Sequence, residues 1–142
     1  MKRSEQLQDL SREHHASLVM AAQVGRAVKQ GGDEEIQATL DRVKHYYATE
    51  LDQHFLHEER TIFAIISAHY PELNDIVEAL LKEHEYIRQL VANVTLETAR
   101  KDLAEFGVLL KSHTRKEERE LFPQVDTLFT DEQLKRVLDN TE

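Results

Sequence analysis

Histidine and glutamate recur in this sequence at a spacing that could bind metal ions. His54 and Glu58 are four residues apart, and so are His113 and Glu117. Residues i and i+4 of an α-helix lie on one face, with their Cβ atoms about 6 Å apart. Each pair would therefore offer one imidazole nitrogen and one carboxylate oxygen to the same site. These donors, without sulfur, suit iron or manganese, and zinc also accepts histidine.

The two pairs belong to a repeated sequence pattern. The phrase H-x3-E-E-R-x-[I/L]-F occurs at residues 54–63 and again at 113–122. A shorter Glu-His pair also occurs twice, at 13–14 and 83–84. The chain thus resembles a duplicated half-site, in which each half has one histidine and one His-x3-Glu pair. A site for two metal ions with two-fold pseudosymmetry would use such a duplication.

The composition excludes several other kinds of site and fold. The 142 residues suit one domain over 1–142, and 18 Lys and Arg against 27 Asp and Glu give a net charge of −9. So acidic a surface disfavours nucleic acid and anionic membranes as partners. Without cysteine there is no disulfide, thiolate metal site or thiol nucleophile. Four Gly and two Pro are too few for the turns of a β-sandwich or barrel, so we expect an all-α protein.

Targeting and membrane segments are not recognisable in the sequence. The basic start of the chain is not followed by an apolar stretch of signal-peptide length, and no later segment could span a bilayer. We therefore expect a cytoplasmic protein without a membrane partner. The sequence does not indicate which protein, if any, it binds.

Helix breakers divide the chain into four long helices and one short one. Gly31-Gly32 suits the end of the first helix, Asp33 could cap the second, and Pro71 separates the second from the third. The expected helices are 4–30, 33–69, 72–93, a fourth that starts at Thr95 or Thr98 and ends near Pro123, and a short one from the capping box at Thr130 to about Leu138. Short connections predict an antiparallel up-down-up-down four-helix bundle with a short C-terminal helix.

Each long helix has an apolar stripe at helical spacing, and each stripe includes a histidine. In chain order the expected core positions are Leu7, Leu10, His14, Leu18, Ala21, Gly25 and Val28; Ile36, Leu40, Val43, Tyr47, His54, Glu58 and Ile65, with Leu51 and Ile62 beside them; Leu73, Val77, Leu80, His84, Ile87, Val91 and Val94; and Leu103, Phe106, Leu110, His113, Glu117 and Leu121. Two buried carboxylates without a cation would cost several kcal/mol, and no Lys or Arg occupies these stripes. The stripes therefore predict a metal centre of one or two ions, with the ligands His14, His54, Glu58, His84, His113 and Glu117.

The remaining polar residues near these stripes have alternative interpretations. His14 is preferred over its neighbour His15 because it shares the stripe, and His45, His57 and His69 are expected to be solvated. Glu50 could accept a hydrogen bond from a ligand histidine or lie at the solvated rim. The charged residues Glu59, Arg60, Arg88, Glu118 and Arg119 are expected to form surface charge pairs, with Glu118, five residues after His113, as an alternative metal ligand.

The motifs at 10–15, 54–58, 83–84 and 113–123 resemble those of the hemerythrin-like, or HHE cation-binding, family of four-helix bundles. This resemblance implies a non-haem di-iron centre, in which the two glutamates bridge both ions, the histidines complete each ion, and open positions meet dioxygen, nitric oxide or peroxide. The oxygen-carrying members have paired histidines one turn apart on the third helix, whereas Leu80 and Arg88 flank His84 here. The chain is therefore similar to the four-His, two-Glu branch.

Three hypotheses about function follow from these observations. The first is a di-iron protein that binds or senses dioxygen, nitric oxide or peroxide. The second is an enzyme that uses the same centre, for example to decompose peroxide or nitric oxide. The third is a metal-free structural or interaction bundle whose histidines are ordinary core residues.

Overall fold

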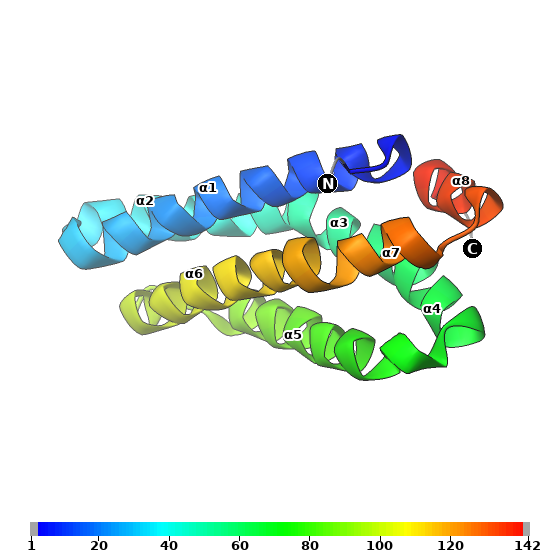
Figure 1. The fold of residues 1–142 in the computed structure, drawn as a ribbon. Helices are drawn as coiled ribbons and strands as arrows, with labels where there is room; N and C mark the ends of the chain where they lie inside the picture. The colour runs from blue at the N-terminus through cyan, green and yellow to red at the C-terminus, as the bar shows by residue number, and fades with distance from the viewer. Residues whose placement is uncertain (1–2, 141–142) are drawn as a thin grey trace.

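The computed structural model describes residues 3–140, and its architecture is the expected all-α bundle. The described chain forms four long helices and the short helix α8 (Asp131–Asp139). The long helices pack side by side, and α8 lies across one end of the bundle (Figure 1). None of the helices in the described part combines the length and the apolar run that a bilayer span requires.

The long helices are interrupted by non-α segments that the sequence did not reveal. The first long helix is α1 (Gln8–Gln30), which follows a 3-10 turn (Glu5–Leu7), and the third is α5 (Asn74–Asn93), which follows a 3-10 turn (Pro71–Leu73). The second long helix consists of α2 (Asp33–Tyr46), α3 (Asp52–Glu58) and α4 (Ala64–His69), which are joined by the π-helical segments Tyr47–Leu51 and Glu59–Phe63. The fourth consists of α6 (Ala99–Lys116), the π-helical segment Glu117–Leu121 and α7 (Phe122–Leu128). Helix α8 is Asp131–Asp139.

The helix ends confirm some of the expected caps and correct others. The capping box is confirmed, since Thr130 Oγ1 accepts from the Gln133 N–H at 3.1 Å and the Gln133 side chain accepts from the Thr130 N–H at 2.9 Å. The cap at Asp33 is wrong, because Gly32 occupies the N-cap position and Asp33 is already helical. Gly31 is needed for space rather than for a positive φ: a Cβ there would lie 2.6 Å from the Ala27 carbonyl oxygen.

The fourth long helix does not end near Pro123, as the sequence suggested, but continues to Leu128. Pro123 follows the π-helical segment directly, at the start of α7. A proline is tolerated in the first turn of a helix, because the N–H that it lacks has no regular partner there. The irregular turn before it therefore lets the helix pass through a residue that would otherwise end it.

The core consists of two apolar clusters with a polar layer between them. One cluster lies towards α8 and includes Leu10, Ile62, Leu80 and Leu121, and the other lies towards the far end and includes Ala21, Phe55, Ile87 and Leu110. The candidate ligand histidines fall between members of the two clusters along each long helix. The fold thus encloses the polar side chains at mid-height between two hydrophobic ends.

The expected apolar stripes are confirmed on the third and fourth long helices, where every named residue is buried. On the first stripe Leu7, Leu10, His14 and Ala21 are confirmed as buried, but Leu18, Gly25 and Val28 are wrong: Ser17, Val24 and Ala27 are buried in their place. On the second, Tyr46 is buried in place of Tyr47, and its hydroxyl lies 2.7 Å from the Ser17 hydroxyl. Tyr46 and Leu51, the next buried position, are five residues apart, which is the extra residue of a π turn.

Candidate metal centre

The structure brings all six predicted ligands together in the buried middle layer. His54 is the most exposed of them, at only 5 %, and Glu58, Glu117 and His84 are at 0 %. His14 comes from α1, His54 and Glu58 from α3, His84 from α5, and His113 and Glu117 from the fourth long helix. The prediction that His14, and not its neighbour His15, faces the core is confirmed, because His14 is buried and His15 is exposed.

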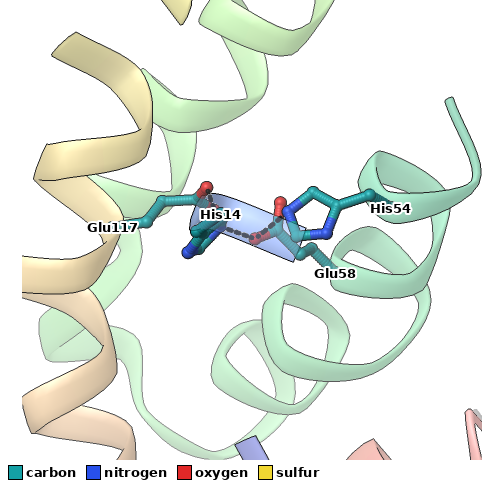
Figure 2. A group of neighbouring side chains, drawn as sticks. All are labelled: His14, His54, Glu58 and Glu117. Carbon is teal, nitrogen blue, oxygen red and sulfur yellow. Dashed lines mark hydrogen bonds and ion pairs between the residues drawn. The ribbon is translucent and has the colours of Figure 1, made fainter. Parts of the chain in front are cut away.

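The six side chains form two groups of four that share both glutamates. One group is His14, His54, Glu58 and Glu117, and the other is Glu58, His84, His113 and Glu117; within each group one donor atom per residue lies within 4.8 Å of the others. Figure 2 shows the first group, with its imidazoles and carboxylates turned toward one another. Such an arrangement could hold two ions, with the carboxylates between them.

Glu58 has one oxygen on each side of the centre. Its Oε2 is 3.2 Å from Nε2 of both His14 and His54, and its Oε1 is 3.1 Å from His84 Nε2. Oε1 of Glu117 is 3.1 Å from His14 Nε2 and 3.0 Å from His113 Nε2. All four histidines therefore present Nε2 to the carboxylates.

Several of these buried atoms have no hydrogen-bond partner. Among the described residues they include Nε2 of His54, His84 and His113, with Glu58 Oε1 and Glu117 Oε2. Their close approaches to the opposite groups lack hydrogen-bond geometry, although the distances are short. Buried polar atoms without partners are costly, and metal ions coordinated by nitrogen and oxygen would satisfy these five atoms together. The residues therefore fit a metal centre.

A carboxylate holds the other ring nitrogen of each histidine. The Nδ1 atoms of His14, His54, His84 and His113 lie 2.7, 2.6, 2.7 and 2.8 Å from carboxylate oxygens of Glu118, Glu13, Glu59 and Glu83, respectively. In each contact Nδ1–H donates to the carboxylate, so that Nε2 is the ring nitrogen that faces the centre. Such carboxylate–histidine contacts orient metal ligands and make them more basic.

These four contacts form a closed circuit around the bundle. Each glutamate lies on one long helix and each histidine on the next, in the order first to second, second to third, third to fourth and fourth to first. Cations hold three of the acids in turn: Arg88 donates to Glu59 at 2.9 Å, Lys116 to Glu83 at 2.9 Å, and Arg3 to Glu118 at 3.4 Å. Each helix thus positions a candidate ligand of its neighbour.

The sequence interpretation missed this circuit. The prediction that Glu59 and Glu118 form charge pairs is confirmed by their contacts with Arg88 and Arg3, but it is incomplete, because both acids also accept from buried histidines. Each of the four acids is adjacent in sequence to a predicted ligand, as in Glu13-His14 and Glu58-Glu59. That adjacency was a usable signal, because neighbouring residues on a helix point to different helices of the bundle.

Other polar residues near the stripes lie outside the centre. Glu50 is exposed and has no hydrogen bond to a ligand histidine, which favours the solvated-rim interpretation. His45 and His69 are exposed, as expected, but His57 is half-buried and donates from Nε2 to the Val137 carbonyl at 2.6 Å. The expectation that Arg60 and Arg119 form surface charge pairs is wrong, since neither forms an ion pair with the described residues.

Two π-helical segments begin directly at the His-x3-Glu pairs. One starts at Glu59, the residue after Glu58, and the other starts at Glu117 itself. Isolated π turns inside α-helices are frequent at functional sites, since the extra residue turns side chains relative to the regular helix. The Glu-Glu sequence at each start therefore sends one carboxylate inward and the next to a neighbouring helix.

Burial and charge act in opposite directions on the ionisation of the centre. Burial opposes the charged form of His54 and His113, yet Glu58 and Glu117 raise the pKa of the two imidazoles to about 9. Burial would raise the pKa of Glu58, but His54, His14 and His84 lower it well below its usual range. The pKa of Glu83 falls to about 2, chiefly because it accepts from His113 and then from Lys116. In the metal-free chain, protons on the histidines supply the positive charge that the carboxylates need.

Aromatic side chains surround the histidines and keep water out. The ring of Phe55 stacks on His84 with centroids 3.9 Å apart, and Phe63 lies 5.5 Å from the same imidazole. Phe122 is 5.0 Å from His14. A dry environment strengthens the electrostatic interactions of the donors, which favours a dication at this place.

The comparisons with known proteins identify the family and nothing narrower. The model of the family described as Hemerythrin HHE cation binding domain matches residues 6–125. No curated protein and no solved structure matches the chain. The matched range includes all six candidate ligands and the four glutamates that hold them.

Proposed function

Because this chain belongs to the hemerythrin HHE cation-binding domain family, we propose that it holds two iron ions and binds or senses dioxygen, nitric oxide or peroxide. The observation that supports the proposal most directly is the pair of four-residue groups that share Glu58 and Glu117. His14 and His54 would hold one ion, His84 and His113 the other, and both carboxylates would lie between them. Two non-haem irons supply redox-active positions for a small exogenous ligand.

The chain's own residues have defined tasks in this proposal. Glu58 and Glu117 bring negative charge to a layer that lacks any buried Lys or Arg among the described residues. The Nδ1 contacts would keep the proton of each neutral imidazole on Nδ1, so that a metal ion could replace the proton on Nε2. Four protein donors per ion are fewer than the six positions that iron commonly uses, so positions are left for an exogenous ligand.

Metal analysis and optical spectra test the proposal. Protein expressed with iron should contain close to two iron atoms per chain and show charge-transfer absorption in the near ultraviolet that changes on exposure to nitric oxide or azide. His54→Leu should lower the iron content, whereas His45→Leu, at an exposed histidine on the same long helix, should not. Both variants should be compared for folding by circular dichroism.

The alternatives give different results in the same experiments. A folded, iron-free preparation that cannot be reconstituted, and that His54→Leu leaves equally stable or more stable, would mean a metal-free bundle. Steady-state consumption of peroxide or nitric oxide by the iron form, lost in Glu58→Ala, would mean an enzyme. Binding without turnover would agree with a binding or sensing role.

A further inference from the structure

An apolar groove lies on the surface between α5 and α6, outside the metal centre. It has a volume of about 620 Å³, and its apolar lining is Tyr86, Ala104, Val108 and Leu109. Val108 is 72 % exposed and Tyr86 is 50 % exposed, so both side chains are open to solvent. The Tyr86 hydroxyl on α5 donates to Glu105 on α6. Exposed apolar side chains that cluster in a concave surface are typical of binding sites.

A row of cations continues from this groove along the fourth long helix. Lys111, Arg115 and Arg119 follow Val108 by three, seven and eleven residues, and the four residues line one continuous depression. All three cations are exposed and form no ion pair with any residue in the range 3–140. Lys82 adds another exposed cation at the edge of the groove. The depression also includes Lys116 and one acid, Glu120, so its cations outnumber its acids, whereas the whole chain has a net charge of −9.

We propose that this face binds an acidic, amphipathic helix of a partner protein. Its apolar residues would fill the groove at Tyr86 and Val108, and its carboxylates would pair with Lys111, Arg115 and Arg119. Amphipathic helices bind apolar grooves in this way, and charges at the edge select the partner and its orientation. From Ala104 to Arg119 the surface extends about 22 Å, which matches a partner helix of about four turns.

Charge distinguishes this occupant from a second copy of the chain. In a two-fold dimer centred on Lys111 and Arg115, these cations of one copy would lie close to those of the other. Like charges in contact oppose association. An anionic membrane would match the cations but not the concave groove, and it would repel the acidic remainder of the surface.

The groove also has a direct connection to the metal centre. Glu83 lines it and accepts hydrogen bonds from His113 Nδ1 at 2.8 Å and from Lys116 at 2.9 Å. A helix in the groove would therefore lie one side chain away from a candidate ligand. Communication between the partner and the metal rests on the proposed function, whereas the docking does not, and the two are tested separately.

The docking is tested with the metal-free, ¹⁵N-labelled full chain and a synthetic probe. The probe is an amphipathic peptide of roughly 18 residues, with leucine on one face and glutamate on its flanks; the comparison peptide has lysine in place of glutamate. We expect the acidic peptide to bind about tenfold or more tightly than the basic one and to shift the NMR signals of 82–86 and 104–119. The double variant Lys111→Glu, Arg115→Glu should weaken its binding by about tenfold or more.

A matched double variant, Arg26→Glu with Lys29→Glu, reverses two exposed, unpaired charges on α1 and should leave the affinity unchanged. Equal binding of the two peptides, shifts outside these residues, or no binding of the acidic peptide would overturn the proposal. A dimer in sedimentation that the Lys111→Glu, Arg115→Glu variant alters would assign the face to a second copy. Association only with phosphatidylserine vesicles would assign it to a membrane, and both results would overturn the proposal.

Repetition with the iron-loaded chain tests the connection through Glu83. A change of affinity between the two forms would show coupling between the groove and the centre. Identical affinities would overturn the coupling and leave the docking established, while failure to bind iron would contradict the proposed function alone.

Discussion

The carboxylates at Nδ1 decide how the four histidines present themselves. A neutral imidazole that donates from Nδ1 has its lone pair on Nε2, and here every Nε2 faces the shared glutamates, where a metal ion would replace its proton. Without that contact, the ring can turn and either nitrogen can carry the proton. The orientation of each candidate ligand is therefore a property of a residue on another helix.

Glu13→Gln should weaken metal binding while the bundle remains folded. Glu13 accepts from His54 at 2.6 Å and is half exposed, so the substitution removes the charge from the contact without opening the core. Loss of such a partner commonly costs 10- to 100-fold in metal affinity, and we expect about that loss in competition with a chelator. Glu50→Gln, at an exposed acid of the same pocket, is the control. Equal effects of the two variants would contradict a positioning role for Glu13.

The stability of the metal-free chain should depend on pH in a defined direction. The pKa values of His54 and His113 are raised to about 9 in the folded protein, so their contribution is complete below about 6.5 and is lost as the pH rises through 9. The pKa of Glu58 is lowered, so its contribution is present above about 4.5 and is lost on acidification below that. Urea unfolding of the metal-free protein should therefore show maximal stability between about pH 5 and 6.5 and a decline towards pH 9. A stability that increases from pH 6.5 to 9 would contradict this ionisation scheme.

Sequence spacing predicted the six candidate ligands but not the residues that hold them. His54 and Glu58 share a helical face with apolar residues, so their burial could be recognised along one helix. Glu13 and Glu59 lie beside candidate ligands in sequence but point to other helices. Because they lie outside the apolar stripes, the sequence alone gives them the pattern of solvent-exposed glutamates. Their partners are 41 and 25 residues away, which only the packed bundle reveals.

At the scale of helices, the π-helical segments keep the apolar stripe and the candidate ligands of one long helix on the same side of the bundle. On the second long helix the step from Tyr46 to Leu51 is five residues, whereas a regular helix returns to the same face after three or four. The stripe drawn through Tyr47 assumed a regular helix and was therefore one residue off. A search for steps of five between apolar residues would have found this segment.

Insertion of one alanine after Ala48 should disrupt both packing and metal binding. Ala48 is exposed within the π-helical segment, and an added residue would lengthen the step from Tyr46 to Leu51 from five residues to six, which neither an α turn nor a π turn accommodates. Helix α2 would then rotate relative to α3 by about 100°, the turn of one residue. Either the apolar stripe of α2 or the pair His54 and Glu58 would leave the core. We expect a lower melting temperature and fewer metal ions per chain. Ala48→Ser, which keeps the length, should change neither, and an insertion variant with normal stability and metal content would show that the five-residue step is not required.

At the scale of the whole molecule, α8 covers one end of the bundle. It lies beyond the family match at 6–125, and Leu134 and Val137 bury their side chains in the cluster at that end. Tyr70 donates to the Leu128 carbonyl at 2.8 Å and to the Gln133 side chain at 2.6 Å, which joins α8 to the opposite turn. The capping box predicted this helix from the sequence, but its packing partners are far away along the chain.

The double variant Leu134→Ala, Val137→Ala should destabilise the protein through the cavity left at this end. Large-to-small substitutions at such positions cost on the order of 3 kcal/mol or more together, so the melting temperature should fall by roughly 10 °C. Leu138→Ala makes the same kind of truncation on the same helix at a residue that is 47 % exposed, and it should have little effect. A similar fall in both variants would mean that α8 contributes through its helicity rather than through burial.

The enclosure of the ligand layer between two apolar clusters has a kinetic consequence. An ion in the middle layer would be surrounded by side chains that are at most 5 % exposed, and each imidazole would be tied to a second helix. Its departure would require one long helix to separate briefly from its neighbours. The residence time of the ion would therefore follow the opening rate of the bundle, and substitutions far from the ligands that accelerate opening would shorten it.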